Sequence, residues 1–113
     1  MYKIKTFNQI AVRGLERFSR DGYEVGSEIA DPQAILLRSH KLENTALTPN
    51  LLAVARAGAG TNNVPVDACT EHGIVVFNTP GANANSVKEL VLAALLIAAR
   101  DVVGGIGYVS SLK

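Results

Sequence analysis

The sequence predicts an α/β fold, a flavodoxin-like doubly wound parallel sheet of about five strands. Short apolar runs alternate with helical stretches, and their spacing leaves room for a crossover between successive strands. Hydrophobic residues make up 48% of the 113 residues, and 11 Lys and Arg nearly balance 10 Asp and Glu, so the chain can bury a core. Right-handed crossovers then favour the flavodoxin-like strand order.

The strands are predicted from apolar runs of strand length. The first run alternates with a period of two, the second is short, and the third is a continuous apolar run typical of a strand covered on both faces. In chain order, we expect strands at residues 2–7, 23–25, 34–37, 51–57 and 74–77.

Helices are expected between these strands. Asn8 is placed to cap a helix over residues 9–20, which Gly22 would end. A very short helix is expected to start at residues 48–49, where a proline follows a threonine. Residues 65–72 predict one more short helix.

A long helix is expected near the end of the chain. Ser86 and Glu89 have the spacing of a capping box, with the serine at the N-cap. Residues 90–99 contain no polar side chain, and a helix that is apolar all round is normally buried on more than one side. We therefore expect a homo-oligomer, assembled through the helix Val87–Arg100. The glycine-rich stretch 104–107 is interpreted as a loop or a hinge.

Composition argues against several classes of protein. A formal net charge of +1 provides no electrostatic footprint for nucleic acid. The longest apolar run is about half of a membrane span, and residues 1–6 do not begin a signal peptide. The lone cysteine, Cys69, fits a cytoplasmic protein. Cys69 shares a helix face with His72, but no further ligands accompany the two residues, so no metal site is expected.

Three loops with unusual residues are expected at the carboxyl edge of the sheet, where ligands bind in open α/β folds. Arg38 follows the third strand, and its planar positive fork suits a carboxylate or a phosphate. Gly58 and Gly60 follow the fourth strand and can turn backbone amides toward an anion. Asn83 follows the fifth. Each alone could be a surface ion pair, a turn or a cap; together they predict a pocket for a small anionic molecule.

The glycine-rich segments do not match a dinucleotide-binding loop. The segment 58–60 is followed by Asn63 where the fingerprint requires its third glycine. The segment 105–107 follows a helix instead of a strand, and Ser110 stands at its third glycine position. Neither is interpreted as a nucleotide loop.

Two segments resemble the D-2-hydroxyacid dehydrogenases, and most closely those that act on 3-phospho-D-glycerate. They are residues 56–67, RAGAGTNNVPVD, and residues 73–90, GIVVFNTPGANANSVKEL. The resemblance implies an NAD-dependent oxidation of 3-phospho-D-glycerate to 3-phosphooxypyruvate, in serine biosynthesis. It also implies that residues 1–84 are the N-terminal part of a substrate-binding domain. Residues 85–113 would be a crossover helix and the start of a nucleotide-binding domain.

The same resemblance implies individual site residues. Matching positions would contact the substrate at Arg38, Ser39, Gly58, Ala59 and Asn83, and Ala59 would also touch the nicotinamide side of the cofactor. Ala59 departs from the threonine that many relatives carry.

The residues that the family uses for chemistry have no match in this chain. We expect the catalytic residues, and most of the NAD site, beyond Lys113, so the chain alone is expected to be inactive. Two alternatives stay open. One is a dehydrogenase for another small 2-hydroxy acid, such as glyoxylate or hydroxypyruvate; the other is a non-catalytic flavodoxin-like binding module.

Overall fold

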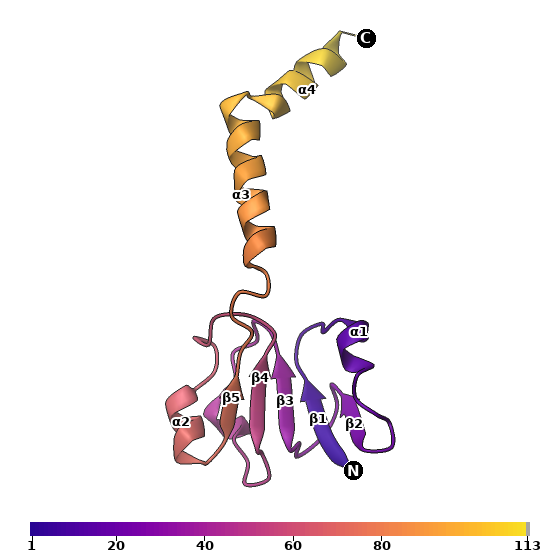
Figure 1. The fold of residues 1–113 in the computed structure, drawn as a ribbon, viewed down its shortest axis with the longest axis vertical. Helices are drawn as coiled ribbons and strands as arrows, with labels where there is room; N and C mark the ends of the chain where they lie inside the picture. The colour runs from indigo at the N-terminus through magenta and orange to yellow at the C-terminus, as the bar shows by residue number, and fades with distance from the viewer. Residues whose placement is uncertain (113) are drawn as a thin grey trace. The chain divides into compact units, whose positions relative to one another are not determined.

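The computed structural model describes residues 1–112 and contains one parallel sheet. The strand order is β2-β1-β3-β4-β5, as Figure 1 shows. The strands are β1 (Tyr2–Thr6), β2 (Tyr23–Gly26), β3 (Ala34–Leu37), β4 (Ala53–Arg56) and β5 (Val75–Phe77). The prediction of a flavodoxin-like α/β fold is therefore confirmed. The chain divides into two compact units, Met1–Pro80 and the residues from Gly81 onward.

The core of the first unit lies on the side of the sheet that faces α2 (Val66–Glu71). Ile35 on β3 pairs in register with Val54 on β4, so both side chains point to this face, and Leu37 follows Ile35 by two positions. Leu37 and Val54 have no exposed surface, and α2 adds the fully buried Cys69. The cluster is completed by Leu42, Leu47, Leu51, Val64 and Ile74.

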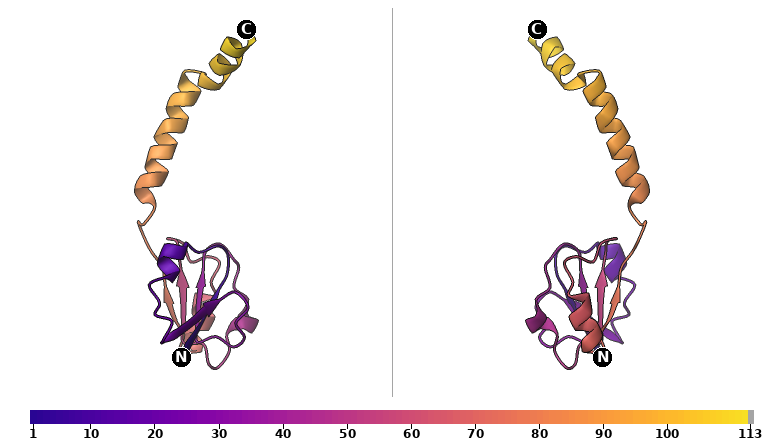
Figure 2. Two further views of the ribbon diagram at one scale, coloured as in Figure 1. Left: turned by 90° about the vertical axis from the view of Figure 1, so that its right-hand side faces the viewer. Right: turned by 90° about the vertical axis from the view of Figure 1, so that its left-hand side faces the viewer.

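The opposite face of the sheet carries α1 (Val12–Leu15), and Figure 2 shows α1 and α2 on different sides of the strands. The predicted helix over residues 9–20 is wrong, because only one turn forms. Asn8 does not cap it: its φ of 64° is left-handed, and its side chain accepts hydrogen bonds from the loop after β3. Gly14, inside the turn, also has low helix propensity.

The short helix predicted at residues 48–49 is wrong as well. The Leu51 amide donates to the Thr48 carbonyl at 3.1 Å, which closes a turn, and the Thr48 hydroxyl donates to Asp31 Oδ1 at 3.0 Å. A 3₁₀ helix, η1, forms earlier, at Asn44–Ala46. The threonine side chain therefore ties two loops together instead of starting a helix.

The second unit consists of α3 (Ala84–Ala99) and α4 (Val102–Ser111). The capping box is wrong, because α3 begins at Ala84, which puts Ser86 inside the helix. Glu89 does not reach back to a backbone amide but accepts from Asn85 Nδ2 at 3.1 Å. The helix predicted over Val87–Arg100 is present, about one turn longer at its start.

The glycine-rich stretch 104–107 is neither a loop nor a hinge, since it lies inside α4. The break comes earlier, at Asp101, whose φ of 45° is left-handed and whose Oδ1 accepts from the Gly104 amide at 3.2 Å. No single helix within residues 1–112 is long and apolar enough to cross a membrane. The helices α3 and α4 meet that criterion only as a pair, bent by 54°.

Candidate functional site

The carboxyl ends of the parallel strands meet at one edge of the sheet, and two of the loops there carry predicted site residues (Figure 1). The Arg38 loop, residues 38–40, follows β3. The Gly58 loop, residues 58–60, follows β4, which is the neighbour of β3 in the sheet. Both loops belong to the first unit, so the fold places them side by side.

Two asparagine side chains hold the Arg38 loop from opposite sides. Asn8 Oδ1 accepts from the backbone amides of Arg38 at 3.1 Å and His40 at 2.9 Å. Asn63 Nδ2 donates to the backbone carbonyls of Arg38 at 2.8 Å and His40 at 2.7 Å. We call Asn8 and Asn63 the asparagine clamp. Because four hydrogen bonds restrain three residues, the position of Arg38 in the site is well defined.

The Arg38 side chain is exposed at this edge, and so is Ser39 beside it. Arg38 Nη1 donates to the Gln9 carbonyl at 3.3 Å. A backbone carbonyl orients the guanidinium without neutralising its charge, so the group remains suited to an anionic ligand.

The His40 side chain of the same loop stacks on the side chain of Phe7. The His40 ring lies against the Phe7 ring at 4.2 Å between centroids with an interplanar angle of 7°. Lys5 Nζ lies 5.3 Å from the centroid of the Phe7 ring. The imidazole is therefore used for packing beside the site.

The Gly58 loop directs its carbonyl groups toward the segment that follows β5. The Thr79 amide donates to the Gly58 carbonyl at 2.9 Å, and Asn78 Nδ2 donates to the Ala59 carbonyl at 2.8 Å. Within residues 1–112, the amides of Gly58 and Ala59 have no acceptor, so both can donate to a ligand. Two neighbouring amides of this kind suit the oxygens of a carboxylate.

The guanidinium of Arg56 lies beneath the Gly58 loop. Its Nη1 donates to Asn62 Oδ1 at 3.1 Å and to Asn63 Oδ1, while its buried Nε has no partner among the described residues. A Cβ atom at position 58 would lie 3.0 Å from this Nε. A side chain at position 58 would therefore have to shift the Arg56 guanidinium by a few tenths of an ångström, a close approach that sequence reasoning did not foresee.

The structure brings four of the five predicted site residues to one edge of the first unit. They are Arg38, Ser39, Gly58 and Ala59. Asn83 precedes α3 in the second unit, so its contact with a substrate stays a prediction. No group of three or more potential metal ligands gathers within residues 1–112.

Sequence reasoning missed three residues that shape this edge, namely Asn8, Asn63 and Arg56. The asparagines carried a weak signal, since Asn tolerates a left-handed φ and has an amide that can replace backbone partners. Arg56 carried none, because a strand-end arginine is ordinarily interpreted as exposed.

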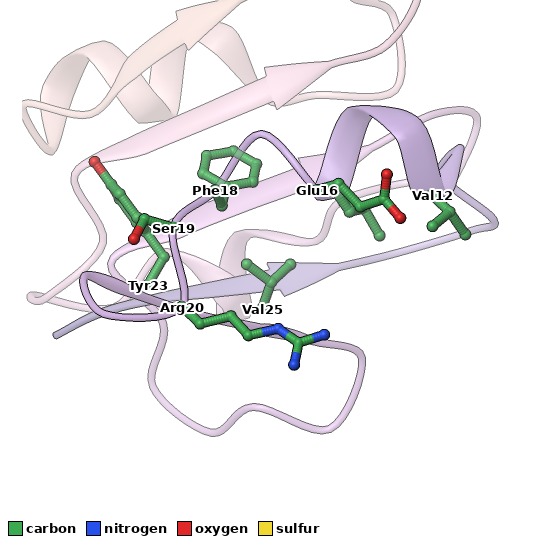
Figure 3. A pocket seen from close by; sticks show the side chains of 8 residues that line it. Val12, Glu16, Phe18, Ser19, Arg20, Tyr23 and Val25 are labelled. Atoms are coloured by element: carbon green, nitrogen blue, oxygen red, sulfur yellow. The ribbon is translucent and has the colours of Figure 1, made fainter.

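A hollow of about 470 Å³ lies elsewhere, between α1 and the edge strand β2. Figure 3 shows Phe18, Tyr23 and Val25 lining it, and Arg20 extends at its border. None of the predicted site residues lines this hollow. It is separate from the loops at the carboxyl edge.

Comparisons with known proteins identify the family of this chain. The family model described as D-isomer specific 2-hydroxyacid dehydrogenase, catalytic domain, matches residues 2–108. D-3-phosphoglycerate dehydrogenase of Mycobacterium tuberculosis (strain ATCC 25618 / H37Rv) is 39% identical over 98 residues, which are 84% of this chain and 18% of that protein. Hydroxypyruvate reductase of Thermotoga maritima is 49% identical over 53 residues, 47% of this chain and 17% of that protein.

A solved structure shares the fold. The crystal structure of NAD⁺-bound 3-phosphoglycerate dehydrogenase in Entamoeba histolytica superposes with a TM-score of 0.73 at 28% sequence identity, over 85% of this chain and 38% of that one. The chain thus spans less than a quarter of the length of the two curated relatives and well under half of the solved one. With a family match over most of its length, the chain belongs to the D-isomer specific 2-hydroxyacid dehydrogenases.

Proposed function

We propose that this chain is the substrate-binding part of an NAD-dependent oxidoreductase that oxidises 3-phospho-D-glycerate to 3-phosphooxypyruvate, a step of serine biosynthesis. The observation that carries the proposal is the pairing of two anion-binding groups at one sheet edge. Arg38 supplies a fixed positive charge, and the amides of Gly58 and Ala59 supply two neutral donors. 3-Phospho-D-glycerate is anionic at both ends, so it can use both groups.

In this proposal the two loops bind and orient the substrate. The amides of Gly58 and Ala59 hold the carboxylate beside the carbon that is oxidised, and Arg38 holds the distant phosphate. Because both interactions are present before and during the reaction, they contribute mainly to substrate binding. The residues that move the proton are proposed to lie outside these 113 residues.

NAD supplies the acceptor for the hydride that leaves carbon 2 of the substrate. The exposed Ala59 fits an apolar contact with a nicotinamide ring, but none of the glycine-rich segments within residues 1–112 matches a phosphate-binding loop. We propose that a separate nucleotide-binding domain of the complete protein holds most of the cofactor. Isothermal titration of the 113-residue chain with NAD is expected to show no tight binding, and a micromolar Kd would contradict this.

Titration of the ¹⁵N-labelled chain with 3-phospho-D-glycerate, followed by NMR, tests the proposed substrate. We expect the amide signals of Gly58 and Ala59 to shift, because they donate to the carboxylate. D-glycerate, which lacks the phosphate, is expected to shift the same amides with a weaker Kd. If neither acid shifts these signals, the chain is not a substrate-binding part for this reaction, and the alternative of a non-catalytic binding module is favoured.

A second candidate function is the oxidation or reduction of a small unphosphorylated acid such as hydroxypyruvate or glyoxylate. The 49% identity to hydroxypyruvate reductase of Thermotoga maritima favours it. The same titration separates the two candidates, since hydroxypyruvate or glyoxylate would then bind at least as tightly as the phosphorylated acid.

We also propose that the protein is a homo-oligomer assembled through α3. This helix has no buried residue, and its leucines are among the most exposed apolar side chains, with Leu90 at 72% and Leu96 at 68%. A second copy of the same helix offers a matching apolar surface. Light scattering over a dilution series, with glutamate substitutions in α3, tests this assembly.

A further inference from the structure

The backbone of the Arg38 loop keeps its hydrogen bonds although the neighbouring strands have ended. β1 ends at Thr6 and β4 ends at Arg56, so neither strand runs beside residues 38–40. The asparagine clamp replaces the hydrogen bonds that a neighbouring strand would make: Asn8 accepts from two amides of the loop, and Asn63 donates to two of its carbonyls. The two side chains thus keep the loop in place where no neighbouring strand does so.

Asn63 differs from Asn8 because all of its side-chain hydrogen-bonding groups contact other segments. Both N–H bonds of Nδ2 are used by the Arg38 loop, and Oδ1 accepts from Arg56 Nη1. Its own carbonyl accepts from the Leu42 amide at 2.9 Å. A half-buried amide with every group satisfied is costly to move or replace.

Arg56 extends this network to the second loop of the site. Its guanidinium is so close to the Gly58 loop that a Cβ atom at Gly58 would lie 3.0 Å from Nε, and one at Gly60 would lie 3.4 Å from Nη1. The Gly58 loop therefore packs closely against the Arg56 guanidinium, and a change in the position of this group changes the support of the loop. The path runs from the Arg38 loop through Asn63 and Arg56 to the Gly58 loop.

We propose that Asn63 is a positioning residue that holds the Arg38 loop and the Gly58 loop in one fixed relation. The inference rests on the proposed function, in which these loops grip opposite ends of one substrate. A ligand held at both ends is sensitive to the separation of its two binding groups, and misplacements of about 1 Å can weaken such sites by large factors. Asn63 itself does not need to touch the substrate.

Asn63→Asp is the decisive variant, with Asn62→Asp as its matched control. Asn63→Asp keeps an oxygen for Arg56 but places a second oxygen against the carbonyls of Arg38 and His40. Asn62→Asp makes the same chemical change at the adjacent residue, whose Oδ1 also accepts from Arg56. We expect the Kd for 3-phospho-D-glycerate, measured by NMR titration, to rise about tenfold or more in Asn63→Asp and less than about twofold in Asn62→Asp.

A double-mutant cycle separates positioning from a general loss of stability. If Asn63 acts by placing Arg38, Asn63→Asp is expected to weaken binding much less in an Arg38→Ala background than in the wild-type chain. Fully additive losses in the two variants, or an unchanged Kd in Asn63→Asp, would overturn the proposal.

Backbone order parameters measured without ligand keep this test independent of the substrate. In Asn63→Asp, we expect ¹⁵N relaxation to show increased mobility in both loops, whereas Asn62→Asp is expected to leave the Arg38 loop rigid. Should the wild-type chain bind no 2-hydroxy acid, the proposed function fails, and these order parameters alone decide the role of Asn63. Unchanged order in the Gly58 loop of Asn63→Asp would overturn that role.

Discussion

The two units of the chain use apolar residues in opposite ways. In Met1–Pro80, strand residues such as Leu37 and Val54 have no exposed surface, because they share one face of the sheet with α2. In the unit from Gly81 onward, α3 and α4 contain no buried residue, although residues 90–99 of α3 carry no polar side chain. Apolar content alone therefore does not make a core; a core also requires a pattern that directs side chains toward a partner.

The largest expected effect concerns the self-association of α3. Burial of a few hundred Å² of this helix contributes several kcal/mol at about 25 cal/mol per Å², before the entropy of association is subtracted. We expect a dimer at micromolar to millimolar concentrations, and a monomer in the variant that combines Leu92→Glu with Leu96→Glu. Light scattering across a hundredfold dilution series measures both.

The control for this experiment lies in the sheet unit. Leu52 is 56% exposed, similar to the helix leucines, so Leu52→Glu places one glutamate at a comparably exposed leucine of the other unit. It is expected to leave the dimer intact. A wild-type chain that is monomeric at every concentration would contradict the proposed assembly.

A leucine-to-alanine truncation in each unit gives the next largest effect, with a buried leucine in the sheet unit and an exposed one in α3. Leu37→Ala should lower the free energy of unfolding by about 2–5 kcal/mol, because it removes packed methyl groups and leaves a cavity. Leu90→Ala should change it by less than about 0.5 kcal/mol, since Leu90 is 72% exposed. Urea denaturation at a protein concentration where the chain is monomeric compares the two. Equal losses would mean that α3 is as well packed as the sheet.

Arg38→Ala tests whether the sheet unit carries the phosphate end of the site. The loss of a charge-assisted hydrogen bond of about 1.5–3 kcal/mol should weaken binding of 3-phospho-D-glycerate about 10- to 150-fold. In the complete enzyme, KM should rise more than kcat falls. Arg17→Ala, a change to another exposed arginine of the same unit, serves as the control. Identical Kd values for the two variants would remove Arg38 from the site.

The smallest expected effect is the pH dependence that the buried thiol of Cys69 gives to the free energy of unfolding. Burial raises the pKa of Cys69 above its ordinary value of 9.0, so the folded protein holds this proton more tightly than the unfolded chain. The free energy of unfolding should therefore fall as pH rises above about 9. Below that pH, the stabilising contribution of the protonated Cys69 thiol is fully present. Urea denaturation between pH 7 and 10 measures the slope. Cys69→Ala should have a shallower slope, and parallel curves for the two proteins would contradict the assignment.

The sheet was predictable because strand signals are local and strand order follows from handedness. Residues 34–37 are identified by a short apolar run, and parallel strands joined by right-handed crossovers leave few possible orders. The boundaries were less accurate, since Leu51 is buried without belonging to β4. A buried side chain and a strand residue look the same in the sequence.

The helix signals failed where a side chain finds a tertiary partner instead of a local one, or where a helix begins at another residue. The serine-glutamate spacing at Ser86 and Glu89 is compatible with a capping box, yet α3 begins earlier and Glu89 binds Asn85. The glycines of residues 104–107 have low helix propensity, but the cap at Asp101 starts a helix through them. Local propensity differs by too little per residue to decide such segments.

By itself, the sequence determined the parallel sheet, the position of Arg38 at the end of a strand and the apolar surface of α3, because each depends on residues a few positions apart. Only the tertiary structure decided that Asn8 and Asn63 hold the Arg38 loop. The partners of Asn8 are 30 and 32 positions away in the chain, and those of Asn63 are 25 and 23 positions away. It also decided that Gly58 lies over Arg56. Hydrogen bonds between such distant residues leave no local pattern, and the fold must bring the strands together before they can form.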